Sequence, residues 1–472
     1  MNLHSSLCVF LFVLLNFTLG VWHEQTWSGD VADRCFCKLQ GEVDDCSCKV
    51  ESLDSLNNNK IYPRLKSLLS RNYFRYFKVN LKKKCPFWSD DSRCALKDCH
   101  VNVCQKDEVP IKTIENVENH EKRKYLNEKS GQKEVDEAQC AEQRELGALD
   151  KTISQEKIAE FQSWKEYDEA LPMFCDVDDE HSNDVEYVDL LLNPERYTGY
   201  KGLSPRRIWR SIYEENCFKP EKNYGYGPEY GSDSSLESSP LFSRGMCLEK
   251  RVFFRLISGL HTSINIHLCD QYLFPAKGGF GSGHWDHNLE EFQSRFDPAL
   301  TNNQGPQRLK NLYFTYLIEL RALAKAAPYL KQEGFYTGDA EEDADLQQGI
   351  NNLLDIIKSF PDHFDESQLF KGNSKEMKQL KAEFVQHFRN ITRIMDCVGC
   401  DKCKLWGKLQ ILGMGTALKI LFSGDSMGLQ STVKSMNKDF QLTRTEIVAL
   451  FNAFGRLSKS IHAIETFRKL AT

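Results

Sequence analysis

The sequence lacks the features of several common classes of protein. Among its 472 residues no long Lys/Arg block carries interleaved aromatics, and the formal net charge is only -6, so nothing indicates nucleic-acid binding. Beyond the N-terminal region no run of about 18 apolar residues occurs, which excludes an ordinary membrane-spanning helix there. Alternating strand patterns are scarce and no repeat of fixed period appears, so the sequence favours neither a β fold nor a repeat array.

The one strongly apolar run lies near the N-terminus. VFLFVLLNFTL, residues 9–19, is too short for a membrane span and lies where a secretory signal has its apolar region. We therefore expect residues 1–20 to be a cleaved signal peptide and residues 21–472 to be the mature protein. The final RKLAT contains no KDEL-type signal, so we expect partners, with peripheral membrane association as a further option, to retain the protein in its compartment.

The C-terminal half shows clear helical periodicity. Apolar residues recur every three or four positions from Met377 to Met395 and from Ile447 to Ile464, and similar patterns cover 248–270, 307–331 and 404–422. The fold class we predict is a mostly α single domain built on a helical bundle, with a helical core from about 150 to 472. A charged segment at 112–137, with few aliphatic residues, is predicted to be a flexible loop.

Cysteine is abundant, and its clustering is informative. The chain has 17 cysteines, of which Cys8 would leave with the signal peptide. With 41% hydrophobic residues a chain of this length can bury a core without disulfides, so the cysteines require another explanation. CFC at 35–37 and CSC at 46–48 favour two nested bridges across a tight loop, within a disulfide-rich N-terminal segment that we place at 35–104.

Cys397, Cys400 and Cys403 form a CxxCxxC motif in DCVGCDKCKLW. A zinc site needs four ligands, and neither a partner CxxC nor an HxxxH motif is present, so we predict no metal. A bridge between cysteines this close restrains the unfolded chain only slightly, which favours a redox-active pair over a staple. One of the three cysteines would then form a structural bridge, and spacing alone does not say which.

The surroundings of this motif favour thiolate chemistry. Lys402 and Lys404 flank Cys403, and a helix is predicted to begin there, so both features should stabilise a thiolate. Cys94 and Cys99 in CALKDC could form a second redox pair, and two pairs suggest a relay through mixed disulfides. Such a relay needs a terminal acceptor cofactor, for which flavin is the usual choice. The absence of GxGxxG argues against a nicotinamide-dependent reductase.

Several longer motifs carry a resemblance to a known family. CALKDC, PERYTGYKG (194–202), IYEENCF (212–218), RLISGLHTSINIHL (255–268), RLKNLYFTYLIELRAL (308–323) and CVGCDKCKLWGKLQ (397–410) closely resemble the endoplasmic reticulum oxidoreductins. These are flavin-dependent thiol oxidases that reoxidise protein disulfide isomerase. The resemblance covers nearly the whole mature chain in order, and it implies a helical bundle that holds FAD.

The resemblance also implies a role for most of the cysteines. Cys400 and Cys403 correspond to an inner redox pair, with Cys403 nearest the flavin ring, and Cys94 and Cys99 correspond to an outer shuttle pair. The other implied assignments are regulatory roles for Cys104 and Cys140 and structural bridges Cys35–Cys48, Cys37–Cys46, Cys85–Cys397 and Cys217–Cys247. The resemblance places no partner for Cys175 or Cys269.

Cofactor contacts are carried over in the same way. The resemblance assigns FAD binding to Arg196, Thr198, Trp209, Ser258, His261, Arg295 and Arg308. Arginines suit a diphosphate, and Trp or His can stack on flat rings. Separately, Asn390 opens the sequon N-I-T, so we predict glycosylation there, on the polar face of its helix or near its end.

The expected function is that of an FAD-dependent thiol oxidase in the lumen of the endoplasmic reticulum. The resemblance implies protein disulfide isomerase and related thioredoxin-like proteins as partners, and oxygen as the acceptor that yields hydrogen peroxide. The alternative is a non-enzymatic lumenal binding protein whose disulfides are only structural. A disulfide isomerase is disfavoured because no thioredoxin-like βαβ pattern surrounds either cysteine pair.

Overall fold

The computed structural model describes residues 50–88, 99–105, 107–110, 174–175, 178, 183–196, 203–218, 247–276, 283–360, 364–371, 374–423 and 442–471. The predicted signal peptide and charged loop, together with Cys35, Cys37, Cys46, Cys48, Cys94, Cys140 and Thr198, lie outside these residues. The predictions made for them therefore stay predictions.

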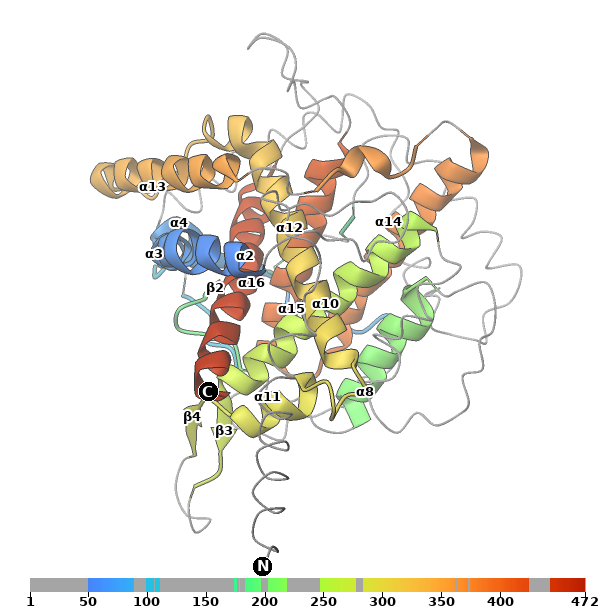
Figure 1. Cartoon of the computed structure of the whole chain (residues 1–472). Helices are drawn as coiled ribbons and strands as arrows, with labels where there is room; N and C mark the ends of the chain where they lie inside the picture. The colour runs from blue at the N-terminus through green and yellow to red at the C-terminus, as the bar shows by residue number, and fades with distance from the viewer. Residues whose placement is uncertain are drawn as a thin grey trace, which may run out of the picture.

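The described chain is mostly helical, as predicted (Figure 1). Its helical elements in chain order are α2 (Val50–Leu56), η1 (Asn57–Ile61), α3 (Tyr62–Leu69), α4 (Asn72–Arg75), α8 (Leu203–Arg210), η4 (Ser211–Asn216), α10 (Leu248–Asp270), α11 (Leu289–Phe296), α12 (Gln304–Leu330), α13 (Ala340–Ser359), η6 (Glu366–Gln368), α14 (Lys375–Ile394), η7 (Met395–Cys397), α15 (Asp401–Phe422) and α16 (Arg444–Ala471). The five segments with helical periodicity correspond to α10, α12, α14, α15 and α16.

Helix starts follow the expected capping chemistry. The Asp339 side chain accepts from the backbone N–H groups at the start of α13, and Ser374 and Asn288 do the same for α14 and α11. These side chains satisfy backbone donors that have no partner inside the helix. The helix boundaries are therefore fixed locally, before packing is considered.

Four long helices form the centre of the bundle. α10 packs along α12, and α15 along α16, while α12 also contacts both α15 and α16 (Figure 1). Two glycines permit the close approach. A Cβ on Gly259 of α10 would lie 2.0 Å from Thr315 Oγ1 of α12, and one on Gly413 of α15 would lie 2.4 Å from the Ala449 carbonyl oxygen of α16. No larger residue fits at either position without displacing a helix.

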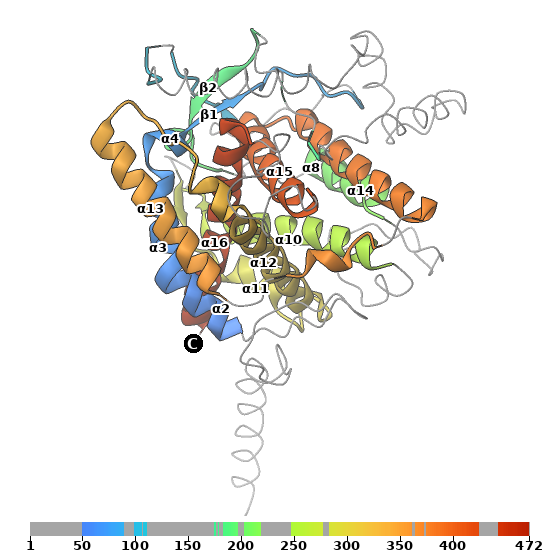
Figure 2. The same ribbon diagram turned by 90° about the horizontal axis from the view of Figure 1, so that it is seen from above.

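Two small antiparallel sheets flank the helices in the described part of the chain. β1 (Tyr76–Val79) pairs with β2 (Glu186–Asp189), and β3 (Tyr272–Phe274) pairs with β4 (His284–Asp286). Figure 2 shows β1 and β2 side by side at one edge of the bundle. Among the described helices, none is both long and apolar enough to span a membrane.

Glu319 of α12 is a buried carboxyl group. Its side chain is 0% exposed, and in the described structure neither carboxyl oxygen has a hydrogen-bond partner. Burial raises the pKa of Glu319 well above its usual value, because the charged carboxylate has neither water nor a hydrogen-bond donor to stabilise it.

Glu319→Gln is expected to change the pH dependence of stability. The folded pKa of Glu319 lies above its unfolded pKa. The wild type therefore loses stability as pH rises from the unfolded pKa to the folded pKa, by up to about 1.4 kcal/mol per pH unit. Glutamine does not ionise, so the variant should gain stability relative to the wild type as pH rises above the unfolded pKa of glutamate. Urea unfolding at several pH values measures this, and parallel curves for the two proteins would contradict it.

Candidate redox site

The inner cysteine pair lies at the start of α15. Cys400 is the N-cap residue, and its sulfur accepts the Cys403 backbone N–H at 3.3 Å. The two sulfur atoms are 2.7 Å apart, and both side chains are buried. A disulfide bond is about 2.05 Å long, so the pair needs only a small adjustment to form one. The helix begins at this motif, as predicted, and its N-terminus favours negative charge on a cysteine sulfur in the first turn.

The two lysines predicted to stabilise a thiolate lie in the first turn of α15. Lys402 and Lys404 are both buried, at 8% and 7% exposure, and the Lys404 ammonium group donates to the Leu81 carbonyl oxygen at 3.3 Å. Lys404 therefore anchors the chain after β1. At the helix terminus, the Cys403 backbone N–H donates directly to the Cys400 sulfur.

Cys99 of the predicted outer pair packs directly against the inner pair. Cys99, Cys400 and Cys403 form one buried cluster, bordered by Ile264, Leu268 and Val398. Cys99 is disulfide-bonded and 8% exposed. The structure thus brings Cys99 into contact with the inner pair, which lies about 300 residues away in the sequence. That arrangement suits exchange through a mixed disulfide.

The loop that carries Cys99 is fixed to β2. The Cys104 backbone N–H donates to the Tyr187 carbonyl oxygen at 2.9 Å, and Val103 forms a bridge with Val188. Burial, and then the nearby Asp189 carboxylate, raise the pKa of the Cys104 thiol. Cys104 is therefore mostly protonated at neutral pH and a slow nucleophile.

The third cysteine of the motif forms the structural bridge. Cys397 is bonded to Cys85, with an S–S distance of 2.08 Å and a sequence separation of 312 residues. The bridge ties η7 to the chain that follows β1, directly before the inner pair. The pairing implied by the family resemblance is confirmed.

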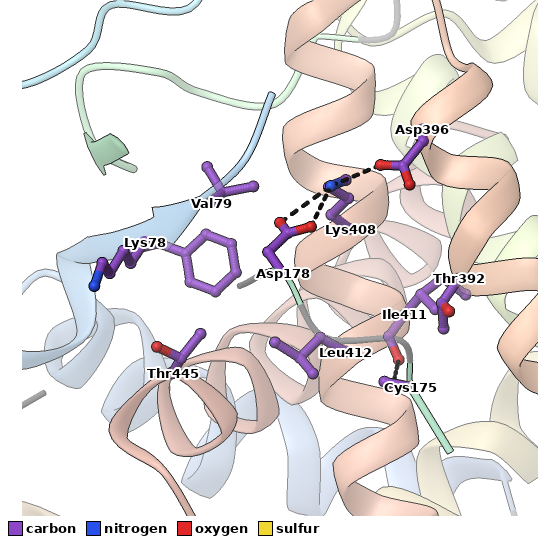
Figure 3. Close-up of a pocket in the computed structure, with 11 residues that line it drawn as sticks. Lys78, Val79, Cys175, Asp178, Thr392, Asp396, Lys408, Ile411, Leu412 and Thr445 are labelled. Atoms are coloured by element: carbon purple, nitrogen blue, oxygen red, sulfur yellow. Dashed lines mark hydrogen bonds and ion pairs between the residues drawn. The ribbon is translucent and has the colours of Figure 1, made fainter. Parts of the chain in front are cut away.

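An ion cluster supports the same region from the other side of α15 (Figure 3). Lys408 pairs with Asp178 at 2.9 Å and with Asp396 at 2.7 Å. Asp396 precedes the bridged Cys397, and its side chain is only 2% exposed. Lys83 lies farther off, at 3.6 Å from Asp178 and 3.8 Å from Asp396. The cluster therefore holds α15, η7 and the segment after β1 together.

Lys408→Met is expected to destabilise the fold. Removing one member of a buried ion cluster leaves its partners uncompensated, and such changes cost about 3–5 kcal/mol. Lys83 supplies part of the missing charge, so we expect a loss of about 3 kcal/mol, measured by urea unfolding. The control is Lys358→Met on the exposed face of α13, which should change stability by less than about 0.5 kcal/mol. Equal effects from both variants would contradict the role of the cluster.

A pocket adjoins the inner pair on the side of Cys403. It encloses about 580 Å³, part of it open to solvent, and is lined by Cys403, Trp209, Ile264, Trp406 and Gln410, with further aliphatic side chains from α8, α10 and α14. Cys400 is not among the lining residues. A mostly apolar cleft with a few polar side chains at its wall is typical of a site for a cofactor or another small molecule.

Two predicted cofactor contacts form an aromatic pair at this pocket. The Trp209 and His261 rings stack with centroids 3.5 Å apart and an interplanar angle of 13°. Burial, and then the charges of Arg308 and Arg295, hold the pKa of His261 well below its usual value, so the imidazole is neutral. Its Nδ1 and the Tyr213 hydroxyl are 3.2 Å apart. Neutral stacked rings can accept a flat ligand without a charge penalty.

The predicted arginine contacts gather near this pair. Arg308 is 5% exposed and donates to the Arg295 carbonyl oxygen at 3.1 Å, while the Arg295 side chain binds Glu291 and Asn265. The Arg196 guanidinium lies 4.6 Å from the Trp285 ring. The Arg196 backbone carbonyl oxygen accepts a hydrogen bond from the Cys403 thiol at 3.6 Å. Arg196 therefore contacts the inner pair through its backbone and Trp285 through its side chain.

Ser258 is fully buried in the contact between α10 and α12. Its hydroxyl oxygen accepts from the Asn311 side-chain amide at 2.8 Å. Thr198, the remaining predicted contact, lies outside the described residues.

The residues present suit a flavin dinucleotide. The buried Trp209 indole N–H has no hydrogen-bond partner in the described structure, which leaves a donor available to a ligand. Stacked rings, an apolar cleft that reaches Cys403 and two nearby arginines supply the recognition that a flat ring system and a diphosphate need. In the described residues, no group of His, Cys, Asp and Glu side chains could hold a metal ion.

Sequence reasoning missed a buried polar network beside the site. The Glu195 carboxylate pairs with Arg456 of α16, and its carbonyl oxygen lies 3.2 Å from His267 Nε2. Arg456 also donates to the Ser263 carbonyl oxygen at 3.1 Å. An arginine within the apolar run of α16 was the available signal. This network fixes the backbone of Arg196 over Cys403.

Two predictions differ from the structure. Asn390 is 1% exposed and accepts from the Gln386 amide at 3.1 Å, so it does not lie on an exposed polar face. It does lie near the end of α14, four residues before Ile394, which was the other predicted position. A glycan on Asn390 would have to displace this packing. The predicted Cys217–Cys247 bridge is not formed: Cys217 is buried, whereas Cys247 is an exposed thiol just before α10. The intervening residues 219–246 lie outside the described part of the chain.

Cysteine pairs that lie close enough to exchange are the working parts of thiol–disulfide oxidoreductases, and the three-cysteine cluster in this helical fold defines that class. The family model for Endoplasmic Reticulum Oxidoreductin 1 matches residues 60–464, and the chain belongs to this family. It is therefore an oxidoreductase.

Individual relatives match this chain along nearly their whole length. The chain is 49% identical to the Ero1-like protein of Drosophila melanogaster, covering 99% of this chain and 98% of the relative. It is 47% identical to ERO1-like protein alpha of Homo sapiens, covering 98% of each. A solved structure of Ero1p, described as a source of disulfide bonds for oxidative protein folding in the cell, is similar with a TM-score of 0.55 and 30% identity over 89% of this chain and 98% of that one.

Proposed function

We propose that this protein is an FAD-dependent thiol oxidase of the endoplasmic reticulum lumen. It reoxidises protein disulfide isomerase and related thioredoxin-like proteins, and so drives oxidative protein folding. The observation that carries the proposal is the contact of Cys99 with Cys400 and Cys403, the last of which lines the pocket that contains Trp209. A protein whose disulfides are only structural has no need of two cysteine pairs in contact beside such a pocket.

The first step is exchange at the outer disulfide. A substrate thiolate attacks Cys94 and releases Cys99, and the second substrate thiolate attacks the mixed disulfide and releases Cys94. The substrate leaves as a disulfide, and Cys94 and Cys99 have gained its two electrons, with protons taken up from solvent. The loop at 99–105, fixed to β2, keeps Cys99 at the inner pair while this happens.

The second step is transfer to the inner disulfide. Cys99 attacks Cys400 and displaces Cys403, and Cys94 then attacks Cys99, which restores the outer disulfide and releases Cys400. Cys403 leaves as a thiolate within the first turn of α15, where the helix terminus stabilises negative charge. The buried, apolar surroundings of the cluster exclude competing thiols.

The last step takes place at the pocket. When bound there, FAD would supply a two-electron acceptor for the Cys400–Cys403 dithiol, with oxygen as the final acceptor and hydrogen peroxide as the product. Trp209 and neutral His261 would hold the ring systems, and Arg295 and Arg308 would bind the diphosphate. The Arg196 carbonyl oxygen, 3.6 Å from the Cys403 sulfur, can hold the thiol proton until transfer.

The test of this function combines colour with oxygen uptake. Purified protein should absorb at about 450 nm from bound flavin and consume oxygen when given reduced protein disulfide isomerase. A folded, colourless protein that consumes no oxygen would favour the alternative, a non-enzymatic disulfide-stabilised binding protein.

Cys104→Ala with Cys140→Ala is expected to remove a lag from this oxygen uptake. Exchange of Cys94–Cys99 into Cys94–Cys140 and Cys99–Cys104 would occupy both shuttle cysteines and switch the relay off. Cys104 lies on the same fixed loop as Cys99, and its raised pKa makes this exchange slow. The double variant should begin at full rate with reduced protein disulfide isomerase. An unchanged lag would show that these cysteines are not regulatory.

A further inference from the structure

The turn after β2 shows an inverted burial pattern. In the sequence DLLLN, Asp189 is 2% and Asn193 0% exposed, whereas Leu191 is 50% and Leu192 63% exposed. Burying a leucine side chain is favourable, so two adjacent leucines left exposed contribute less to the stability of this fold than buried leucines would. We refer to Leu191 and Leu192 as the leucine pair.

The leucine pair stands on an ordered turn. The Asn193 backbone N–H donates to the Asp189 carbonyl oxygen at 3.1 Å, and the Leu191 N–H donates to the Asp189 carboxylate at 2.9 Å. Asp189 is in turn paired with Arg75. The exposure of the leucines is therefore part of a defined backbone conformation.

The same turn is hydrogen-bonded both to the loop that carries Cys99 and to α15, which carries Cys403. Asn193 exchanges two hydrogen bonds with Asn102, at 2.7 and 2.8 Å, and Asn102 lies three residues after Cys99. The Asn193 carbonyl oxygen accepts from the Trp406 indole N–H at 2.8 Å, and Trp406 lies three residues after Cys403. The leucine pair thus has a fixed position beside the cysteine cluster.

We propose that Leu191 and Leu192 are a docking contact for the protein dithiol that the outer pair oxidises, which rests on the proposed function. A substrate sulfur must come within bonding distance of the disulfide that contains Cys99, and Cys99 is only 8% exposed. A protein that brings its dithiol so close must cover the adjoining turn. The partner surface that suits the leucine pair is an apolar rim around a surface dithiol, because covering these side chains recovers the burial that the fold forgoes.

This contact distinguishes protein substrates from small thiols. Dithiothreitol has no surface to place on the leucine pair, whereas a folded substrate gains binding energy there before any bond is exchanged. The leucine pair should therefore affect the KM for protein dithiols and leave the chemistry unchanged.

The experiment compares Leu191→Ser/Leu192→Ser with Leu300→Ser/Leu470→Ser. The control leucines are 67% and 51% exposed and lie on other parts of the surface. In the full-length protein, the KM for reduced protein disulfide isomerase should rise about tenfold in the first variant, equivalent to about 1.4 kcal/mol, with kcat and the rate with dithiothreitol unchanged. The control should behave as wild type, and both variants should keep the wild-type unfolding midpoint.

Three results would overturn the docking contact: an unchanged KM, the same rise in the control variant, or a fall in the dithiothreitol rate equal to that with the protein substrate. A change in the oligomeric state of the first variant would assign the leucine pair to contacts between copies of this chain instead. Failure of the docking contact differs from failure of the proposed function, because in the latter case the wild type would oxidise neither dithiothreitol nor protein disulfide isomerase.

Discussion

Replacing Cys403 by alanine is expected to abolish oxygen consumption with every thiol substrate. Cys403 lines the Trp209 pocket, and its sulfur is 2.7 Å from that of Cys400, so we propose it as the group through which electrons leave the cysteine relay. Removing the residue that makes and breaks the reacting bond costs a factor on the order of 1,000 or more. Oxygen uptake with both dithiothreitol and reduced protein disulfide isomerase measures the loss.

Cys269→Ala is the matched control. Cys269 is also buried in the bundle, on α10, and burial raises the pKa of its thiol to about 12, so it takes no part in exchange at neutral pH. This variant should keep the wild-type rate. Residual activity above about one tenth of wild type in Cys403→Ala would contradict the assignment of Cys403.

The second large effect is a loss of activity toward protein substrates but not toward small thiols. Cys94→Ala/Cys99→Ala is expected to lose activity toward reduced protein disulfide isomerase by a factor on the order of 100 or more, because the intramolecular transfer from Cys99 is replaced by direct attack on a buried pair. Dithiothreitol is small enough to reach Cys400 once the outer loop carries no cysteine, so its oxidation should persist.

The double substitution is preferable to Cys94→Ala alone. In that single variant Cys99 would remain packed against the inner pair as a thiol and could block Cys400 by forming a mixed disulfide. Oxygen uptake with the two reductants, measured on the same preparation, gives the selectivity directly. Equal and complete loss with both reductants would contradict a two-stage relay.

Much of the fold could be predicted from the sequence, because long amphipathic helices leave a local signal. The apolar positions of α10, α14 and α16 recur at helical spacing, and the structure confirms each helix. The sequence analysis did not single out α13, although Leu346, Ile350 and Leu353 follow the same spacing and are all 0% exposed. Its polar, acidic first turn hid the signal.

The site could be predicted only in part, because contacts between distant segments leave no local pattern. Spacing could not decide which cysteine of CxxCxxC forms the bridge, since the partner Cys85 lies 312 residues away. The cluster of Lys408 with Asp178 and Asp396 likewise joins segments that are remote in sequence. The burial of Asn390 was not predicted, because α14 is buried on a wider face than its apolar residues alone indicate.

Trapping the mixed disulfide between the two pairs tests the relay most directly. In Cys94→Ala/Cys403→Ala each pair retains one cysteine, and oxidation should join Cys99 to Cys400, which peptide mass mapping without reduction would detect. The companion variant Cys94→Ala/Cys400→Ala should give much less of the Cys99–Cys403 bridge, because Cys403 faces the pocket. Absence of the Cys99–Cys400 bridge, or equal yields from both variants, would contradict transfer from Cys99 to Cys400.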